Sequence, residues 1–133
     1  RLFTPAAVNR STLSVLTGLY APTRGDCYVF GLSICRCARR VYTLMGICPQ
    51  HDVLWRSLTV SEHMQHYAAL KGVPRGELAS AAAAMVAKVG LADKEHTRSH
   101  ALSGGMRRKL SVGCSLVGGS RCVLLDEPLS SIT

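Results

Sequence analysis

The chain has 133 residues, 47% of them hydrophobic and 18% charged, so it has material for the core of one domain and is not disordered by composition. Its formal net charge of +8 is compatible with nucleic acid, an anionic membrane surface, phosphate ligands, or a piece of protein whose acidic part lies elsewhere. The basic residues are scattered, no run of aromatic residues offers a stacking platform for bases, and no apolar stretch approaches the roughly 20 residues of a membrane helix, so we expect neither nucleic-acid binding nor a membrane span here.

The first half of the chain contains one predicted helix and two predicted strands. Residues 11–17 have helical character and end at Gly18. Residues 27–30 form a short strand candidate between two glycines. Residues 42–48 are a second strand candidate, which ends at Pro49. Strands at this spacing after a helix are typical of an α/β domain.

The pattern then changes from strand to helix. Thr59 and Glu62 have the spacing of a capping box, in which each side chain binds the other residue's backbone N–H. We expect that helix to end near Leu70. A second helix is predicted over residues 76–89, with Gly90 directly after it.

A third helix and a final strand follow. Ser103 is a suitable N-cap, and apolar residues recur after it at helical spacing. These residues are Met106, Leu110, Cys114 and Val117. Residues 122–125 are an apolar strand whose carboxyl end delivers Asp126 and Glu127. Strands and helices therefore alternate around an inserted helical block, which predicts an α/β fold with a parallel sheet.

The six cysteines contain no C-x-x-C pair, and Cys114 and Cys122 lie in apolar runs, so we interpret the cysteines as reduced thiols. A zinc site formed by Cys35, Cys37, Cys48 and His51 is the alternative. All five histidines are interpreted as polar surface residues: His51, His63, His66, His96 and His100.

Two motifs carry candidate chemistry. In the sequence L-S-G-G-M, Gly104 and Gly105 would expose backbone N–H groups at a helix N-terminus, where the helix dipole favours an anion. In the sequence V-L-L-D-E-P, Asp126 can hold magnesium and Glu127 can polarise water. Each motif alone is compatible with an ordinary helix cap or a polar turn. Because one helix and a return loop separate the two motifs, the pair is stronger evidence for phosphate and magnesium chemistry than either motif alone.

Together these motifs resemble the signature motif and the Walker B motif of ATP-binding cassette (ABC) nucleotide-binding domains. The segment G-I-C-P-Q-H-D resembles the Q-loop of that family, with Gln50 as its glutamine. Further segments resemble the lipid-transporting A subfamily, namely residues 16–19, 48–51, 58–60 and 70–72 and Met106. The resemblance implies a P-loop NTPase-like fragment with a partial parallel sheet and an inserted helical subdomain. It would comprise residues 1–50 (Walker A to Q-loop), 51–101 (helical subdomain) and 102–133 (signature motif to Walker B).

The resemblance also implies a function. An intact domain of this family would bind ATP and Mg²⁺ between two such domains facing head to tail, at the cytoplasmic face of a membrane, and would drive transmembrane domains that move lipid. Glu127 would act as general base, Asp126 would hold the metal, and Gln50 would contact both metal and water. The γ-phosphate of the ATP bound by the partner domain would be contacted by Ser103, Gly104 and Gly105.

The sequence departs from the family in its phosphate loop. At the family's spacing, Val8 takes the place of a Walker A glycine, Asn9 that of the lysine and Arg10 that of the magnesium-binding Ser/Thr. An alternative register aligns Arg10 and Ser11 with the lysine and serine but requires a one-residue deletion. Val8 would hinder close backbone approach to phosphate, and Asn9 supplies no charge. We therefore expect impaired ATP binding in this chain.

A second departure follows the Walker B motif, where Leu129 and Thr133 replace the family's threonine and D-loop aspartate. The chain begins at Arg1 and ends at Thr133 directly after this motif, so we expect an internal piece of a longer domain. The alternative hypothesis is a non-catalytic relic or regulatory fragment, such as a truncated or pseudogene-like product.

Overall fold

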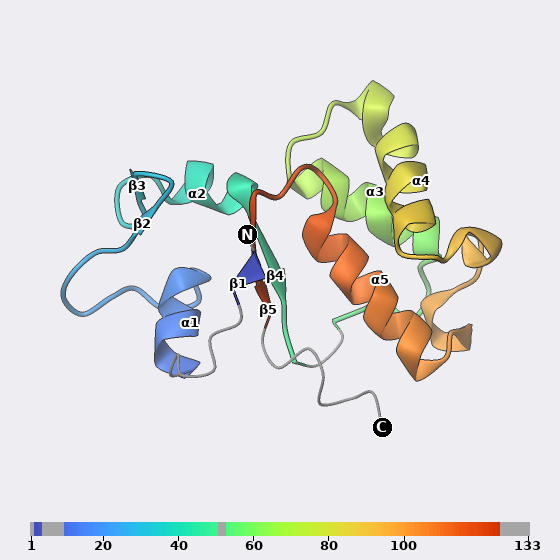
Figure 1. The fold of residues 1–133 in the computed structure, drawn as a ribbon, viewed down its shortest axis with the longest axis horizontal. Helices are drawn as coiled ribbons and strands as arrows, with labels where there is room; N and C mark the ends of the chain where they lie inside the picture. The colour runs from blue at the N-terminus through green and yellow to red at the C-terminus, as the bar shows by residue number, and fades with distance from the viewer. Residues whose placement is uncertain (1, 4–9, 51–52, 126–133) are drawn as a thin grey trace.

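A computed structural model describes residues 2–3, 10–50 and 53–125 of the chain (Figure 1). Its central element is a parallel sheet with the strand order β1 (Leu2–Phe3), β5 (Cys122–Leu125) and β4 (Met45–Cys48). Cys48 pairs with Leu125, so the carboxyl ends of β4 and β5 lie at the same edge of the sheet. The predicted strand at 122–125 is confirmed with these bounds.

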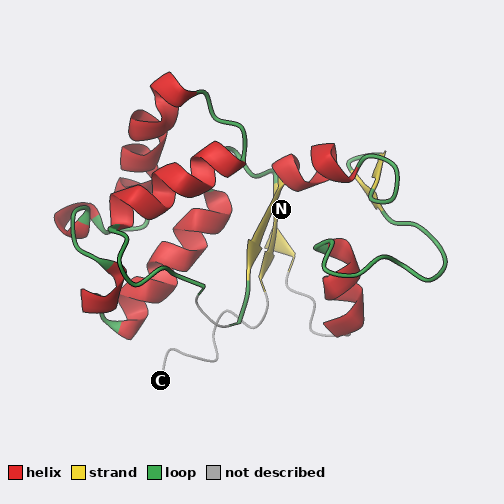
Figure 2. Cartoon of the chain, turned by 180° about the vertical axis from the view of Figure 1, so that it is seen from behind, coloured by secondary structure: helices red, strands yellow, loops and turns green. Residues whose placement is uncertain are grey.

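The two faces of the sheet are covered differently (Figure 2). Helix α5 (Gly104–Leu116) packs closely on one face, because a side chain at Gly46 would collide with the carbonyl oxygen of Ser115. On the other face, Met45 and Leu124 form a cluster with side chains of α1 (Arg10–Leu16) and α2 (Ala38–Leu44). The α/β architecture expected from the sequence is therefore confirmed.

The N-terminal half differs from the sequence expectation at one boundary. Residues 42–44, which were predicted as the start of a strand, belong to helix α2. The strand β4 begins at Met45. The β-branched and aromatic composition of this segment favours a strand locally. Tertiary contacts override it: Val41 is buried in the sheet-side cluster, and the Arg121 N–H binds the carbonyl of Leu44 at the end of the helix. The predicted strand at 27–30 is one arm of a short antiparallel hairpin of β2 (Tyr28–Val29) and β3 (Leu32–Ser33).

The inserted helical block agrees closely with the sequence. The capping box is present at the start of α3 (Val60–Leu70), where Thr59 Oγ1 accepts from the Glu62 N–H and Glu62 Oε2 accepts from the Thr59 N–H. The helix predicted over 76–89 is α4 (Leu78–Lys88), preceded by the 3-10 turn η1 (Arg75–Glu77). Two further 3-10 turns, η2 (Ala92–Lys94) and η3 (Ser99–Ala101), lead to α5.

Helices α3, α4 and α5 share a hydrophobic core. Leu110, Cys114 and Val117 are buried in it as their helical spacing predicts, and Met106 packs at its margin. The helices approach closely, since a side chain at Gly113 would collide with the end of Met64. Burial and the neighbouring Cys48 raise the pKa of the Cys114 thiol to about 12, so this cysteine is a protonated core residue.

The six cysteines are free thiols, although Cys122 is only half-buried. Among the described residues, no group of three or more His, Cys, Asp or Glu side chains is placed to hold a metal ion. His51, part of the alternative zinc site, lies outside the described residues. Within 2–3, 10–50 and 53–125, none of the helices has the length and apolar character needed to cross a bilayer.

One histidine was placed wrongly by sequence reasoning. His63 is fully buried on α3, whereas His66, His96 and His100 are exposed as expected. Its Nε2 accepts a hydrogen bond from the Trp55 N–H at 3.0 Å, so its Nδ1, 2.8 Å from the Thr59 carbonyl oxygen, carries the proton. Burial lowers the pKa of His63. The imidazole therefore acts as a neutral link between the chain before α3 and the first turn of the helix.

Candidate functional site

The signature turn, residues Ser103, Gly104 and Gly105, forms the N-terminus of the 13-residue helix α5. Ser103 is the N-cap, and its hydroxyl oxygen accepts from the Met106 N–H at 3.3 Å. The N–H groups of Gly104 and Gly105 are first-turn groups, which have no acceptor within a helix. Both glycines are exposed, and a Cβ added at Gly105 would meet no described heavy atom within 4 Å. Backbone donors at this turn are thus open to a ligand.

The electrostatics of this turn suit an anion. The first turn of α5 carries no acidic residue, and the helix dipole places partial positive charge there. Arg107 adds a guanidinium one turn along, where its Nη1 donates to the carbonyl of Leu102 at 3.0 Å. The predicted site residues Ser103, Gly104 and Gly105 therefore occupy the kind of position that binds phosphate in other proteins.

Gln50 lies beside this helix. The strand β4 ends at Cys48, and the next two residues, Pro49 and Gln50, are half-buried. Arg108, which is only 6% exposed, directs its guanidinium to these two residues. Its Nη1 donates to the Pro49 carbonyl at 2.7 Å and to the Gln50 carbonyl at 3.5 Å. The structure thus joins the predicted Q-loop and the predicted signature helix.

Sequence reasoning missed Arg108. In the run Arg107-Arg108-Lys109 the three basic residues look alike, and only their burial separates them. The hydrophobic spacing contained no usable signal, because Arg108 lies about 200° around the helix from Leu110 and shares its face with two buried serines, Ser111 and Ser115.

The remaining predicted site residues lie at the start of α1 or outside the described residues. Asn9, Asp126 and Glu127 lie outside the described residues. Arg10 and Ser11 are the first two residues of α1, and their side chains are not among those described. A helix that begins here agrees with the predicted helix at 11–17 within one residue.

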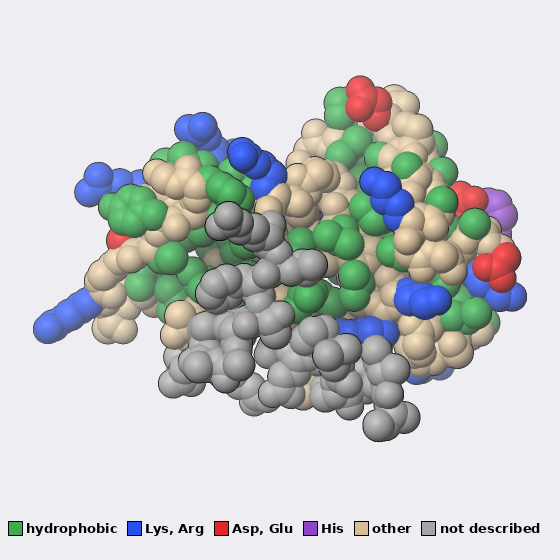
Figure 3. Space-filling model, viewed as in Figure 1, with side chains coloured by type: hydrophobic (Ala, Val, Ile, Leu, Met, Phe, Trp, Pro, Cys, Tyr) green, Lys and Arg blue, Asp and Glu red, His purple; other side chains and the backbone are tan. Residues whose placement is uncertain are grey.

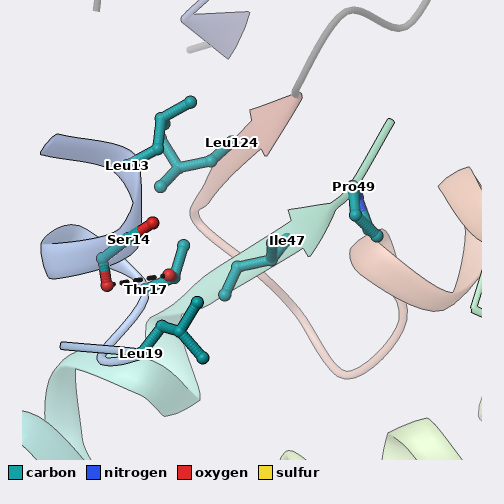
Figure 4. A pocket seen from close by; sticks show the side chains of 7 residues that line it. All are labelled: Leu13, Ser14, Thr17, Leu19, Ile47, Pro49 and Leu124. Atoms are coloured by element: carbon teal, nitrogen blue, oxygen red, sulfur yellow. Dashed lines mark hydrogen bonds between the residues drawn. The ribbon is translucent and has the colours of Figure 1, made fainter. Parts of the chain in front are cut away.

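A hollow of about 250 Å³ lies between α1 and the face of the sheet that carries Ile47 and Leu124 (Figure 4). Its described lining is mostly apolar and carries no charge: Leu13, Ser14, Thr17, Leu19, Ile47, Pro49 and Leu124. The Thr17 hydroxyl is already engaged, donating to the Ser14 carbonyl at 3.2 Å. The described part of this lining therefore offers a phosphate no charged group, whereas the signature turn offers free first-turn N–H groups.

The strand order, the helix after β1 and the helical block between β4 and β5 define an ABC-type nucleotide-binding fold. Residues 10–130 match the protein family described as "ABC transporter". The chain belongs to this family.

Its similarity extends to individual members. Over 122 residues the chain is 47% identical to the human protein "Phospholipid-transporting ATPase ABCA3", covering 92% of the chain and 7% of that protein. It is 42% identical to mouse "ATP-binding cassette sub-family A member 17" over 119 residues, or 90% of the chain and 7% of the relative. A solved "Structure of ATP binding subunit of ABC transporter" superposes with a TM-score of 0.79 at 21% identity, covering 98% of the chain and 54% of that subunit. The chain thus spans a small part of its curated relatives, and the solved subunit confirms the fold.

Proposed function

We propose that this chain is the nucleotide-binding part of an ATP-driven lipid transporter and couples ATP binding and hydrolysis to lipid movement by transmembrane domains. The observation that carries the proposal is the open, positively polarised signature turn at the start of α5. The similarity to a protein named as a phospholipid-transporting ATPase supports lipid as the substrate class. The domain would lie at the cytoplasmic face of the membrane, with residues 1–50, 51–101 and 102–133 as its three parts.

The signature turn fits a phosphate group supplied by a second domain. Gly104 and Gly105 offer backbone N–H donors without side chains in the way, and Ser103 places a hydroxyl at the same end of the helix. Preorganised donors of this kind stabilise charge that develops in phosphoryl transfer. We infer that these residues contact the γ-phosphate of ATP held mainly by the partner domain.

The remaining roles rest on the family resemblance. Asp126 would hold Mg²⁺, Glu127 would orient and deprotonate the attacking water, and Gln50 would contact metal and water. Bound Mg²⁺ would neutralise charge on the phosphates. The Asn9, Arg10 and Ser11 segment would cradle the chain's own nucleotide poorly, because it lacks the lysine and the flexible glycine of a functional loop. The ATP site that contains Glu127 would then bind ATP weakly. The partner's ATP site would keep all of its contributing residues, because this chain's signature turn completes it.

The experiment is steady-state ATP hydrolysis and lipid translocation by the full transporter in phospholipid vesicles. Hydrolysis stimulated by lipid, and reduced by substitution in the signature turn, is the expected result. Absence of both activities in a correctly folded, membrane-inserted protein would refute the proposal.

The second candidate function is a non-catalytic relic or regulatory fragment. It is favoured by the departures at Val8, Asn9, Leu129 and Thr133. The coding sequence on both sides separates the two hypotheses. An upstream strand bearing an aromatic residue for adenine, a downstream switch histidine and transmembrane helices would favour the transporter.

A further inference from the structure

Arg108 forms a buried link between two segments that are far apart in the sequence. Only 6% of the residue is exposed, and its Nη1 donates to the carbonyls of Pro49 and Gln50 at 2.7 and 3.5 Å. Burial of a charged group costs free energy unless the group is hydrogen-bonded, so these contacts hold the guanidinium in its buried position. The first is as short as a charge-assisted hydrogen bond usually is.

The link connects residues of two proposed ATP sites, because the signature turn faces the nucleotide of the partner domain and Gln50 faces the nucleotide of this chain. Arg108 lies five residues after Ser103 on the same helix, roughly 7.5 Å along its axis. The two carbonyls that it binds belong to the peptide units on either side of the Gln50 Cα. Because α5 is a continuous helix, a displacement of the signature turn moves Arg108 with it, and the Q-loop backbone must follow or the hydrogen bonds break.

We propose that Arg108 is a positioning residue that fixes the backbone of Pro49 and Gln50 to the signature helix, so that Gln50 and the signature turn move as one unit. The proposal rests on the proposed function for its consequence in ATP hydrolysis, but the link itself can be tested without nucleotide. Arginine suits this role because its guanidinium directs several N–H groups from a planar, delocalised cation, which a lysine ammonium does not reproduce.

The same helix offers a matched control. Lys109 is the next residue, carries the same charge, and is exposed. Removing its charge by Lys109→Met changes the net charge of the chain as Arg108→Met does, without touching the buried link.

The first experiment is hydrogen exchange, followed by mass spectrometry, on the full-length protein without nucleotide. We expect Arg108→Met to accelerate exchange in peptides covering residues 45–55 by about tenfold, as loss of a hydrogen bond to a charged group would do. Peptides from α4 should be unchanged, and so should every peptide in Lys109→Met. Unchanged exchange at 45–55 in Arg108→Met, or equal acceleration across the whole domain, would overturn the proposal.

A second variant covers the case in which Arg108→Met loses helix content by circular dichroism. Arg108→Lys keeps the charge and most of the stem, so it should fold and still accelerate exchange at 45–55, by less than the Met variant. Exchange equal to that of the unchanged protein would show that a positive charge alone is sufficient, and the positioning role of the guanidinium would be wrong.

The second experiment measures the Mg²⁺ dependence of ATP hydrolysis in the full transporter. In a transporter whose phosphate loop is repaired by Val8→Gly and Asn9→Lys, so that this chain's own site turns over, Arg108→Lys should raise the Mg²⁺ concentration needed for half-maximal hydrolysis while changing the KM for ATP less, because the displaced Gln50 is the proposed metal contact of that site. A proportional loss of activity at every Mg²⁺ concentration would contradict this role. If the unchanged transporter does not hydrolyse ATP at all, the proposed function fails, and the exchange experiment still decides whether Arg108 holds the Q-loop.

Discussion

The helical block and the sheet-side half of this chain differ in how completely their cores are closed. Among the described residues, the core cluster of the block has ten buried members, although Leu70 of α3 is 66% exposed, and the sheet-side cluster has four. On the sheet side, Tyr28 remains 67% exposed and Phe30 52%, with the Arg121 guanidinium 4.7 Å from the Phe30 ring centroid as partial cover. Hydrophobic side chains are visible over the region of β2, β3 and α2 (Figure 3).

The difference has a physical cause. Three helices satisfy their backbone hydrogen bonds internally and need to bury only one face each against their neighbours. A short sheet has two faces and two edges to cover, and each uncovered part exposes apolar side chains or unpaired backbone groups. The helical block, which carries the signature turn, is thus the better packed of the two regions. The sheet-side half, which precedes the Q-loop, also contains the phosphate loop that departs from the family pattern.

The largest effect should come from opening the helical core. Met64→Ala should lower the free energy of unfolding by about 2–5 kcal/mol, because it removes a fully buried side chain from tightly packed helices. Leu13→Ala, in the half-buried sheet-side cluster, should lower it by less. Urea unfolding monitored by circular dichroism measures both. A larger loss for Leu13→Ala would reverse the comparison.

The next effect concerns catalysis. Gly105→Trp should reduce ATP hydrolysis by the full transporter about 100-fold, since it blocks preorganised donors at the signature turn. Glu127→Gln should change turnover little, because we expect the phosphate loop of that site to bind ATP poorly. Steady-state hydrolysis in vesicles tests the pair. If Glu127→Gln abolishes turnover while Gly105→Trp is tolerated, this half of the transporter performs the chemistry and the inference of a damaged loop is wrong.

Repairing the phosphate loop tests the same comparison in the opposite direction. The unchanged chain should bind ATP weakly or not at all, and Val8→Gly combined with Asn9→Lys should tighten binding about tenfold by restoring close backbone approach and a charge-assisted contact. Titration with a fluorescent ATP analogue gives the dissociation constants. Micromolar binding by the unchanged chain that is lost when Asn9 alone is replaced would show that the present loop is functional.

The smallest effect should be a pH dependence confined to the helical block. The folded state lowers the pKa of His63 by burial, so it binds the proton less readily than the unfolded chain does. The stability that this neutral histidine contributes is complete above the unfolded pKa of about 6.5 and is lost as the pH falls below it towards the folded pKa. Urea unfolding at pH 7.5 and 5.5 should show this loss in the unchanged chain and a smaller one in His63→Gln. An equal loss in both would assign the pH dependence to other groups.

Local signals predicted most of the helical block because its boundaries depend on neighbouring residues. The Thr59–Glu62 capping box and the Ser103 cap each satisfy N–H groups of the turn that they begin, so their spacing is visible in the sequence. The boundary between α2 and β4 could not be found in this way. It depends on the burial of Val41 and on a hydrogen bond from Arg121, which is 77 positions from Leu44.

The sequence by itself determined the order of the motifs, the helical spacing that buries Leu110 and Cys114, and the departures from the family at Val8 and Asn9. These follow from residue identity and from contacts within one or two turns of the chain. Only the tertiary structure decided that His63 is buried and that Arg108 holds the backbone of Gln50. Both results depend on segments from elsewhere in the chain that enclose a polar group and supply its hydrogen-bond partners, and periodicity within one helix does not encode those partners.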